Sequence, residues 1–359
     1  MKLGILTFHS AHNYGATLQA YGLQGYLMSL GHEVCIIDYR PWYITNSYQK
    51  DHYTHWLSRR PQKCVVRLYH YVRYRKIRHR RWENFQTFIT NKLNLFPYNV
   101  GMDFSEFDAI FIGSDQVWSP YHTGGNYDNI FFGSGFKCKT IAYAPSCSQS
   151  ALSIEQMAKL RELLKDLTYI SVREFSFQKL LQPLTSKQIS VVVDPSILAG
   201  KKAYDKIAAP IIRNRPYVLI YEIIYHESVY QLAQRLANDL DADVIELTNG
   251  MMNFHRSTMD EGASPEEFLG YIKNAACVIT TSFHGTAFSI LFGTPFYTIR
   301  QHNDGDIRML NILSQLGLQN RMVDSTDDIS FSPLNQVLLD KALSSYCELS
   351  QRYIHDALQ

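Results

Sequence analysis

The chain has 359 residues, of which 46% are hydrophobic and 19% are charged, and its formal net charge is +2. This composition is typical of a globular protein with room for two domains, and the small net charge gives no indication of a nucleic-acid partner. No stretch is apolar enough to cross a bilayer and the first residues read as a strand, not a signal peptide, so we expect a cytoplasmic protein.

Strand-like and helix-like segments alternate along the chain, which predicts parallel sheets with helices on both faces. The expected strands of the first half are residues 2–8, 33–39, 108–113, 139–143, 169–172 and 188–193. Those of the second half are residues 217–221, 243–247, 276–281 and 296–299. Because a stretch with Gly and Pro at 196–216 separates the two series, we predict two α/β Rossmann-like domains, residues 1–200 and 201–359.

Apolar spacing and capping residues predict the helices. Apolar residues recur at helical spacing from 16 to 30, and Gly31 suits the position after the last turn. Two capping boxes mark later helix starts, Ser153 with Gln156 and Ser264 with Glu267. The tail from Pro333 is also helical, and we expect it to cross back to the first domain.

A basic helical insert is expected at about residues 57–90. Between Arg59 and Arg81 there are ten Lys or Arg residues and no acid, with aromatic residues among them. One interpretation is a solvated helix face. Another is attraction to an anionic membrane surface or to a diphosphate-linked acceptor, which would make the protein peripheral on the inner face of the plasma membrane. No nucleic-acid motif accompanies the insert, so we expect no nucleic acid as partner.

The six cysteines show no paired metal-ligand spacing. We expect them to be reduced thiols, and Cys35 and Cys277 lie inside apolar strand-like runs. No other cluster of metal-ligand residues is apparent, and no metal site is expected.

Two loops of the first half follow strands and could contact a sugar. Asn13, Tyr14 and Gly15 lie between the first strand and the first helix, at the position of a phosphate-binding turn, although an ordinary turn is the alternative. The run Gly113–Trp118 offers Ser114, a carboxylate at Asp115 and an aromatic platform at Trp118. Asp115 could act as a base toward a sugar hydroxyl, or it could simply cap a helix.

Two further strand ends offer groups for an anion. Arg173 follows the strand 169–172, where it could grip a carboxylate or phosphate or form an internal salt bridge. The run Ser282-Phe283-His284-Gly285-Thr286 places His284 where a strand gives way to a helix, so helix-start amides and an imidazole could meet an anion there. The stretch from Arg300 to Arg308 should lie beside this turn, where either arginine could complete the pocket or could equally be solvated at the surface.

These motifs resemble, in order, those of the polysaccharide pyruvyl transferase family. The matching runs are Asn13-Tyr14-Gly15, Gly113-Ser114-Asp115-Gln116-Val117-Trp118, Ser171-Val172-Arg173-Glu174, Val193-Asp194-Pro195 and Ser282-Phe283-His284-Gly285. The resemblance covers roughly residues 1–320. It implies two Rossmann-like domains facing a cleft, in a GT-B-like arrangement, with the acceptor on the first domain and the donor on the second.

The resemblance also implies the chemistry. Phosphoenolpyruvate would be the donor and a sugar residue of a cell-surface glycan, or of its polyprenyl-diphosphate-linked precursor, the acceptor. The product would be a cyclic pyruvate ketal, and no cofactor is expected. His284 and Asp115 are the expected catalytic residues. The expected donor contacts are Arg173, Ser282, His284, Gly285, Thr286 and Arg308. The expected acceptor contacts are Asn13, Tyr14, Gly15, Ser114, Asp115 and Trp118.

The chain departs from the family pattern at one position. Many members have Arg-x-His-Gly, whereas Ser282 stands here two residues before His284. Arg300 or Arg308 could supply the missing cation. Two other functions share the expected fold and remain open: a GT-B glycosyltransferase that uses a nucleotide sugar, and a non-catalytic glycan-binding relative.

Overall fold

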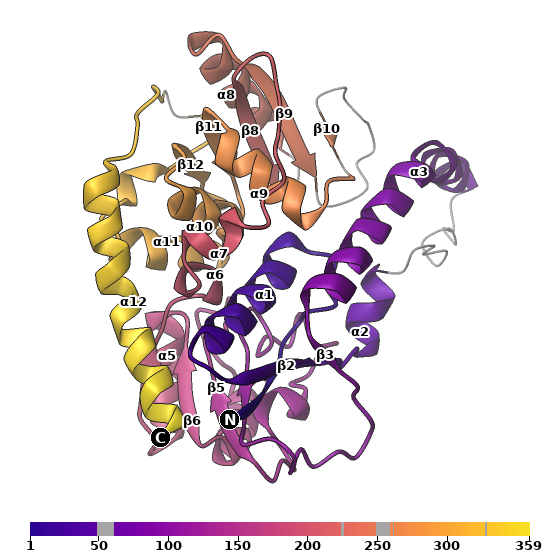
Figure 1. Ribbon diagram of the computed structural model, residues 1–359. Coiled ribbons are helices and arrows are strands. Elements are labelled where there is room, and N and C mark those ends of the chain that lie inside the picture. The colour runs from indigo at the N-terminus through magenta and orange to yellow at the C-terminus, as the bar shows by residue number, and fades with distance from the viewer. Residues whose placement is uncertain (49–60, 224–225, 249–258, 261, 327–328) are drawn as a thin grey trace.

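The computed structural model describes residues 1–48, 61–223, 226–248, 259–260, 262–326 and 329–359, with only the backbone described for 61–71, 74 and 248. Two parallel sheets, each covered by helices on both faces, lie one above the other in Figure 1. Within the described part of the chain no helix is long and apolar enough to span a membrane.

The first sheet has seven strands in the order β3-β2-β1-β4-β5-β6-β7. Its strands are β1 (Lys2–Leu6), β2 (Glu33–Ile37), β3 (Leu95–Phe96), β4 (Ala109–Ile112), β5 (Lys139–Ala142), β6 (Tyr169–Val172) and β7 (Ile189–Val191). The second sheet has six strands in the order β10-β9-β8-β11-β12-β13. They are β8 (Tyr217–Glu222), β9 (Asp243–Thr248), β10 (Met259–Asp260), β11 (Cys277–Thr280), β12 (Phe296–Ile299) and β13 (Met322–Val323). The predicted α/β class is confirmed, but the sequence missed β3, β10 and β13, because two-residue edge strands have no periodicity to detect.

The helices follow the strands as expected from the caps. They are α1 (Tyr14–Ser29), α2 (Trp42–Thr45), α3 (Pro61–Lys92), α4 (Ile154–Leu163), α5 (Phe175–Leu181), α6 (Pro195–Leu198), α7 (Lys201–Asp205), α8 (Glu227–Asp239), α9 (Pro265–Asn274), α10 (Phe283–Phe292), α11 (Asp306–Gln315) and α12 (Gln336–Leu358). Both predicted capping boxes form, at the first turns of α4 and α9.

The long helix α3 reaches from the first domain to the second (Figure 1). Near its middle, Arg80 pairs with Glu267 of α9 at 3.0 Å, and Asn84 donates to the Gly262 carbonyl at 2.8 Å. Arg81 donates to the Tyr14 hydroxyl and lies 4.7 Å from the centre of that ring. The last two arginines of the basic stretch therefore contact other parts of the protein, whereas the membrane interpretation of the stretch stays a prediction.

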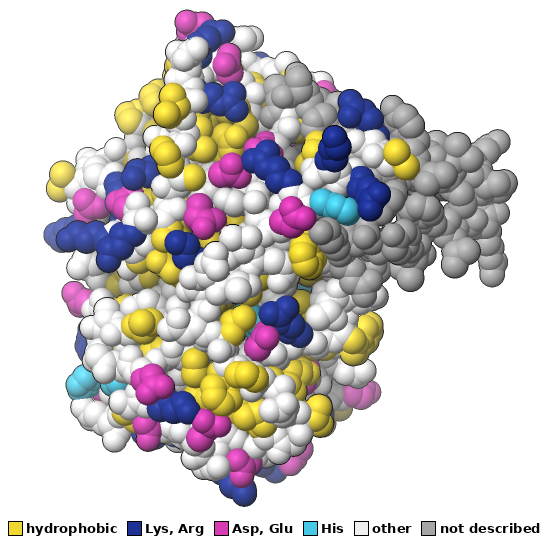
Figure 2. Space-filling view, turned by 45° about the vertical axis from the view of Figure 1, so that its right-hand side comes forward, with side chains coloured by type: hydrophobic (Ala, Val, Ile, Leu, Met, Phe, Trp, Pro, Cys, Tyr) yellow, Lys and Arg dark blue, Asp and Glu magenta, His cyan; other side chains and the backbone are white. Residues whose placement is uncertain are grey.

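Further along the basic patch toward the N-terminus, Arg75 and Lys76 are exposed. Figure 2 shows a group of Lys and Arg side chains next to the grey region on this face of the molecule. Arg59 and the side chains of residues 61–71 lie outside the described part of the chain.

The last helix, α12, follows the second domain in the chain and runs down the side of the molecule to the first (Figure 1). The Tyr353 hydroxyl donates to the Ala142 carbonyl of β5 at 2.8 Å, and Ser350 accepts a hydrogen bond from the Val193 backbone at 2.8 Å. α3 and α12 thus each make contacts in both domains.

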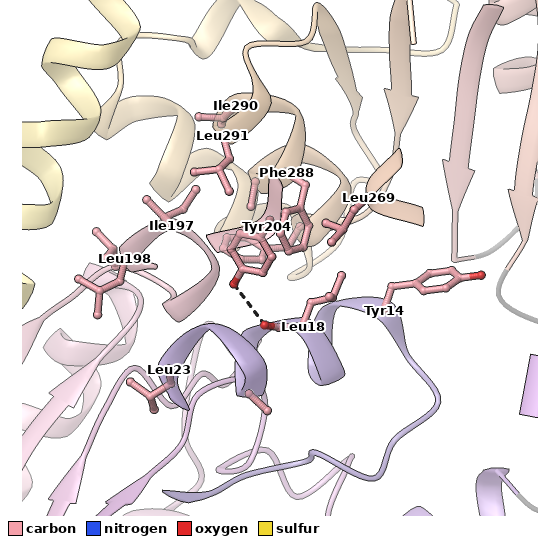
Figure 3. Close-up of a cluster of buried hydrophobic side chains, with 14 of the residues drawn as sticks. Tyr14, Leu18, Leu23, Ile197, Leu198, Tyr204, Leu269, Phe288, Ile290 and Leu291 are labelled. Carbon is pink, nitrogen blue, oxygen red and sulfur yellow. Dashed lines mark hydrogen bonds between the residues drawn. The ribbon is translucent and has the colours of Figure 1, made fainter. Parts of the chain in front are cut away.

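A hydrophobic core joins the two domains beneath the site described below. Tyr204 donates to the Leu18 carbonyl of α1 and packs edge-on against Phe288 of α10 (Figure 3). Tyr14, at the first turn of α1, stacks on Phe268 of α9 with ring centres 4.4 Å apart. Because these contacts hold α1 against α9 and α10, they fix where the first turns of α1 and α10 meet.

Candidate functional site

A cavity of about 230 Å³ lies between the two domains, at the carboxyl edges of both sheets. Its walls come from loops that follow β1, β2, β4, β8 and β11, and from α11. The residues that line it are Phe8, Ala11, Asn13, Ala16, Ile44, Tyr48, Asp115, Gln116, His122, Ile223, Ser282, Phe283, His284 and Arg308. Ligands of parallel α/β proteins bind at this edge of the sheet.

Two helices begin at the cavity, one from each domain. The Asn13 side-chain oxygen accepts hydrogen bonds from the Gly15 and Ala16 amides at 3.0 and 3.4 Å and caps α1. The Ser282 hydroxyl accepts from the Gly285 amide at 3.5 Å and caps α10. Neither helix has an acidic residue in its first turn. The positive ends of both helix dipoles therefore face the same space, which favours an anion.

The two helix starts touch through Gly15 and His284. A Cβ atom on Gly15 would overlap the imidazole, and its nearest neighbour would be Nδ1 of His284. Only glycine allows this approach without a shift of the histidine or of α1. Gly15 was expected to contact an acceptor, and the structure gives it a different task, which is to make room for His284.

His284 lies at the cavity with 6% of its surface exposed. Its Nε2 atom is 3.8 Å from Oδ2 of Asp194 and has no hydrogen-bond partner among the described residues. Burial lowers the pKa of His284, while the Asp194 and Asp115 carboxylates act in the opposite direction. The unbound site therefore holds a neutral imidazole with one ring nitrogen free for a ligand.

Behind this histidine lies a buried ion-pair network around Arg173. Its Nη1 donates to Asp194 at 2.6 Å and its Nε to Glu174 at 3.0 Å. Burial opposes the charge on Arg173, but the two carboxylates, Glu174 first and then Asp194, raise its pKa. Burial would raise the pKa of Asp194, yet His284 and Arg173 lower it. The internal salt bridge, one of the two interpretations of Arg173, is present.

Arg173 is nonetheless close to the cavity. Its guanidinium lies 4.3 Å from the ring centre of Phe283, which lines the cavity, and its Nη2 has no partner among the described residues. Arg173 itself is not part of the cavity wall. It contributes a buried positive charge behind the wall and fixes Asp194 beside His284.

Comparison with known proteins decides the family. A family model described as polysaccharide pyruvyl transferase matches residues 13–303. The chain belongs to the polysaccharide pyruvyl transferase family. No curated protein matches it significantly.

Solved structures with a similar fold include UDP-GlcNAc 2-epimerase from Methanocaldococcus jannaschii, at 12% identity and a TM-score of 0.47, covering 97% of this chain and 93% of that one. The glycosyltransferase SnogD from Streptomyces nogalater has 12% identity and a TM-score of 0.41, covering 99% and 97%. The E. coli heptosyltransferase WaaC has 10% identity and a TM-score of 0.41, covering 99% and 100%. This pyruvyl transferase family member has the two predicted parallel α/β sheets, and the GT-B-like arrangement of its domains stays a prediction.

Of the two arginines that could replace the missing family arginine, the structure places one at the His284 cavity and the other at a different cavity. Arg308, on α11, lines the cavity with His284, and its Nε has no partner among the described residues. Burial and then the Arg173 charge lower the pKa of Arg308, and Asp115 acts against them. Arg300 lines a different cavity. Arg308 is therefore the cation on the cavity wall.

Several expected contacts are corrected. Trp118 has no exposed surface, donates to the Phe131 carbonyl and stacks on Phe132, so it belongs to the core of the first domain and offers no platform to a sugar. Tyr14 is buried between the domains, where its hydroxyl donates to the Ala263 carbonyl.

The hydroxyls of two further residues bind the protein. The Ser114 hydroxyl donates to the Ala144 carbonyl, and that of Thr286 is 2.7 Å from the hydroxyl of Thr298. Gly285 packs against Thr280, and a Cβ at this position would overlap the Thr280 hydroxyl. Ser114, Gly285 and Thr286 are not among the lining residues of the cavity.

Other residues of the wall carried no sequence signal. Ile44 lies on the short helix α2, Tyr48 follows it, and His122 lies in the loop after Trp118. Their approach to His284 depends on how the loops fold over the sheet edge. Among the described residues, no group of three or more His, Cys, Asp or Glu could hold a metal ion.

Proposed function

We propose that this protein transfers the pyruvate unit of phosphoenolpyruvate to two hydroxyls of one sugar residue, forming a cyclic ketal and releasing phosphate. The observation that carries the proposal is the group His284, Arg308 and Asp115 in one interdomain cavity where two helices begin. The donor carries a carboxylate and a phosphate, and these fit Arg308 and the helix-start amides. The proposal rests on the family membership and on this chemistry.

The steps balance with the groups present. Protonated His284 gives its proton to the methylene carbon of the donor, and the adjacent carbon becomes cationic. A sugar hydroxyl adds to that carbon and loses its proton to Asp115, and the carbon–oxygen bond to phosphate breaks. A second hydroxyl of the same sugar then attacks the same carbon and closes the ring, giving its proton to the now neutral His284, and the proton on Asp115 leaves with the phosphate. General acid and base groups at these two points are what the reaction requires.

The histidine must be protonated for this step, although burial lowers its pKa in the free protein. Binding of the donor should raise the pKa of His284 again, because negative charges beside the imidazole favour the imidazolium. Donor binding and His284 protonation are therefore coupled. The positive charge arises when the donor is present to use it.

The acceptor would lie against the first domain. Phe8, Ile44 and Tyr48 form the apolar part of the wall there. Trp42, on the same short helix as Ile44, is 66% exposed, and its ring lies against Gly124. An exposed, supported indole beside a sugar site suits a pyranose face. We therefore assign to Trp42 the role that Trp118 cannot have.

The acceptor is proposed to be linked to polyprenyl diphosphate, which brings the protein to an anionic membrane surface. Arg75 and Lys76 are exposed on α3 and could take part, whereas Arg80 and Arg81 bind the second domain. Vesicle sedimentation checks this: binding should rise with anionic lipid and fall with salt. Equal binding to neutral vesicles would contradict it.

The test of the proposed function begins with thermal shift. Phosphoenolpyruvate should raise the melting temperature, whereas nucleoside diphosphates should not. The second step is phosphate release from phosphoenolpyruvate in the presence of a panel of glycans, with mass spectrometry to detect the added pyruvate. Stabilisation by nucleoside diphosphates alone would support a nucleotide-sugar glycosyltransferase in its place. Tight glycan binding with no phosphate release would support a non-catalytic role.

A further inference from the structure

A second cavity, of about 310 Å³, lies at the carboxyl edge of the second sheet. Its lining residues are His226, Ser228, Val229, Thr281, Ile299, Arg300, Gln301, His302, Asn303 and Ser325. It shares no lining residue with the His284 cavity.

The second cavity lies at the start of α8, and the His284 cavity at the start of α10. α8 packs on Ile220 and Ile279, whereas α10 belongs to the cluster of Leu219 and Val278. Since alternate strand residues face opposite sides, the two helices cover opposite faces of the sheet. The chain passes from β8 to β9 on one side and from β11 to β12 on the other, so the strand order reverses between β8 and β11. Parallel α/β sheets bind ligands at such a point.

The lining provides hydrogen-bond donors and positive charge. Arg300 follows β12 directly, and its guanidinium makes no hydrogen bond or ion pair with the described residues. The 13-residue helix α8 begins there without a side-chain cap, and Ser228 in its first turn offers a backbone amide and a hydroxyl to an anion. His226 and His302 add two imidazoles.

Thr281 contributes a buried hydroxyl to this lining. It is 3% exposed, it lines the cavity, and its hydroxyl has no hydrogen-bond partner among the described residues. Buried hydroxyls are normally paired, because an unpaired one loses its hydration without compensation. The hydroxyl is thus a free donor beside the start of α8.

Four carboxylates lie near this lining, and Glu222, buried at the end of β8, accepts a hydrogen bond from the His226 backbone amide at 3.4 Å. Asp306 accepts hydrogen bonds from the backbone amides of Gln301 and His302 at 3.0 and 2.9 Å. Asp324 accepts from the His302 ring at 2.7 Å. Glu227, in the first turn of α8, is exposed and is not part of the lining. Among the described residues, the lining of this cavity includes no Asp or Glu.

We propose that this second cavity binds a phosphoryl group at Arg300, the Thr281 hydroxyl and the first turn of α8. The site is separate from the donor cavity and does not depend on the proposed function. Thr281 and Ser282 are consecutive, so the two ligands would lie on either side of one strand end. The phosphoryl group could be free phosphate or part of a carrier diphosphate.

Equilibrium dialysis with radiolabelled orthophosphate tests the site. The Arg308→Gln protein is dialysed in parallel, because this change removes an arginine from the wall of the His284 cavity and leaves the second cavity unaltered. One phosphate should remain bound per chain. Arg300→Gln should weaken this binding about tenfold, the effect of losing a charge-assisted hydrogen bond. Thr281→Val, which keeps the shape of the side chain, should weaken it about threefold. Arg161→Gln, which removes an exposed arginine on α4, should leave it unchanged.

The same dialysis with farnesyl diphosphate distinguishes the sources. Tighter binding of the prenyl diphosphate than of orthophosphate, with the same dependence on Arg300, indicates a carrier diphosphate; the reverse indicates free phosphate. Arg308→Gln should leave this second site intact even where phosphoenolpyruvate does not bind at all, which separates the two proposals. The inference is overturned if neither probe binds, or if folded Arg300→Gln and Thr281→Val proteins bind both as the unaltered protein does.

Discussion

The two walls of the His284 cavity differ in charge. Among the described lining residues, the first domain contributes mostly apolar and aromatic groups, one carboxylate at Asp115 and no Lys or Arg. The described part of the second domain contributes Ser282, His284 and Arg308 together with Ile223 and Phe283, and no carboxylate. Under the proposed function, this difference would let a small anion and a neutral sugar share one cavity, with the anion against the second wall and the sugar against the first.

The two histidines on either side of Gly15 sharpen this contrast. His12 belongs to the first domain, stacks on Phe85 and is 2.9 Å from the Gln86 amide nitrogen. It has arginines, not carboxylates, as its charged neighbours, and burial followed by Arg81 and Arg40 lowers its pKa to about 4. His284 has Asp194 beside it and a free Nε2. Only the second is arranged to take up a proton when an anion arrives.

The largest effect should come from His284→Ala. Removing the proposed proton donor should lower kcat by about 10³-fold, the size expected for a general acid. Phosphate release at saturating donor and acceptor measures this. Circular dichroism and a melting curve establish that the variant is folded. If the variant turns over nearly as fast as the unaltered protein, His284 is not the proton donor.

Gly15→Ala tests the contact between the walls without altering any polar group. The new Cβ overlaps the imidazole, so His284 or α1 must move, and kcat should fall about 10²-fold. Gly25→Ala is the matched control, since it lies in the same helix and its Cβ would meet nothing within 4 Å. That change should stabilise the protein by about 0.5–1 kcal/mol and leave turnover unchanged. Equal activity of the two variants would show that the approach of Gly15 to His284 is unimportant.

Arg308→Gln tests the charge of the second wall. The KM for phosphoenolpyruvate should rise about tenfold or more, because a charge-assisted hydrogen bond to the donor is lost. The KM for the acceptor should change little, since Arg308 belongs to the other wall. Arg161→Gln is the control for loss of one positive charge. A rise in the acceptor KM alone would reverse our assignment of the walls.

Trp42→Ala tests the first wall. Its acceptor KM should rise several-fold, as expected for the loss of one stacking contact of about 1 kcal/mol, with the donor KM unchanged. Ile212→Ala provides the control, because Ile212 is 88% exposed and is not among the lining residues of the His284 cavity. Identical acceptor kinetics for the two variants would show that the sugar does not contact Trp42.

His12→Gln should have the smallest effect on turnover. Its expected effect is on how the free energy of unfolding depends on pH. His12 has a folded pKa of about 4, below its ordinary value of 6.5, so its neutral form favours the folded state. This contribution is complete above pH 6.5 and is lost as pH falls toward 4, up to about 3 kcal/mol. Urea unfolding at pH 7 and pH 4.5 should therefore show a smaller acid loss for the variant. An unchanged difference would mean that His12 is not held neutral.

The fold and the site were predictable to different degrees. Each long strand left a run of apolar residues, and the capping boxes at Ser153 and Ser264 marked helix starts, because these signals are local. His284 and Asp115 could be proposed from their place at strand ends. Trp118 was misassigned, because a tryptophan after a strand reads the same whether its indole faces the solvent or the core. Trp42 gave no signal, since its exposure depends on how α2 lies over the sheet edge.

The sequence by itself determined two series of parallel strands and the helix starts at the cavity, because these depend on the local spacing of residues. It also determined the family of the chain, because the family motifs occur in order along it. Tertiary structure decided which of the candidate cations lie on the wall of the His284 cavity. Arg173 is drawn into a buried pair with Glu174 and Asp194, whereas Arg308, from a helix distant in the chain, lies on the cavity wall. The physical reason is that a buried charge must be paired or must face a ligand, and only the packing of the two domains determines which of these occurs.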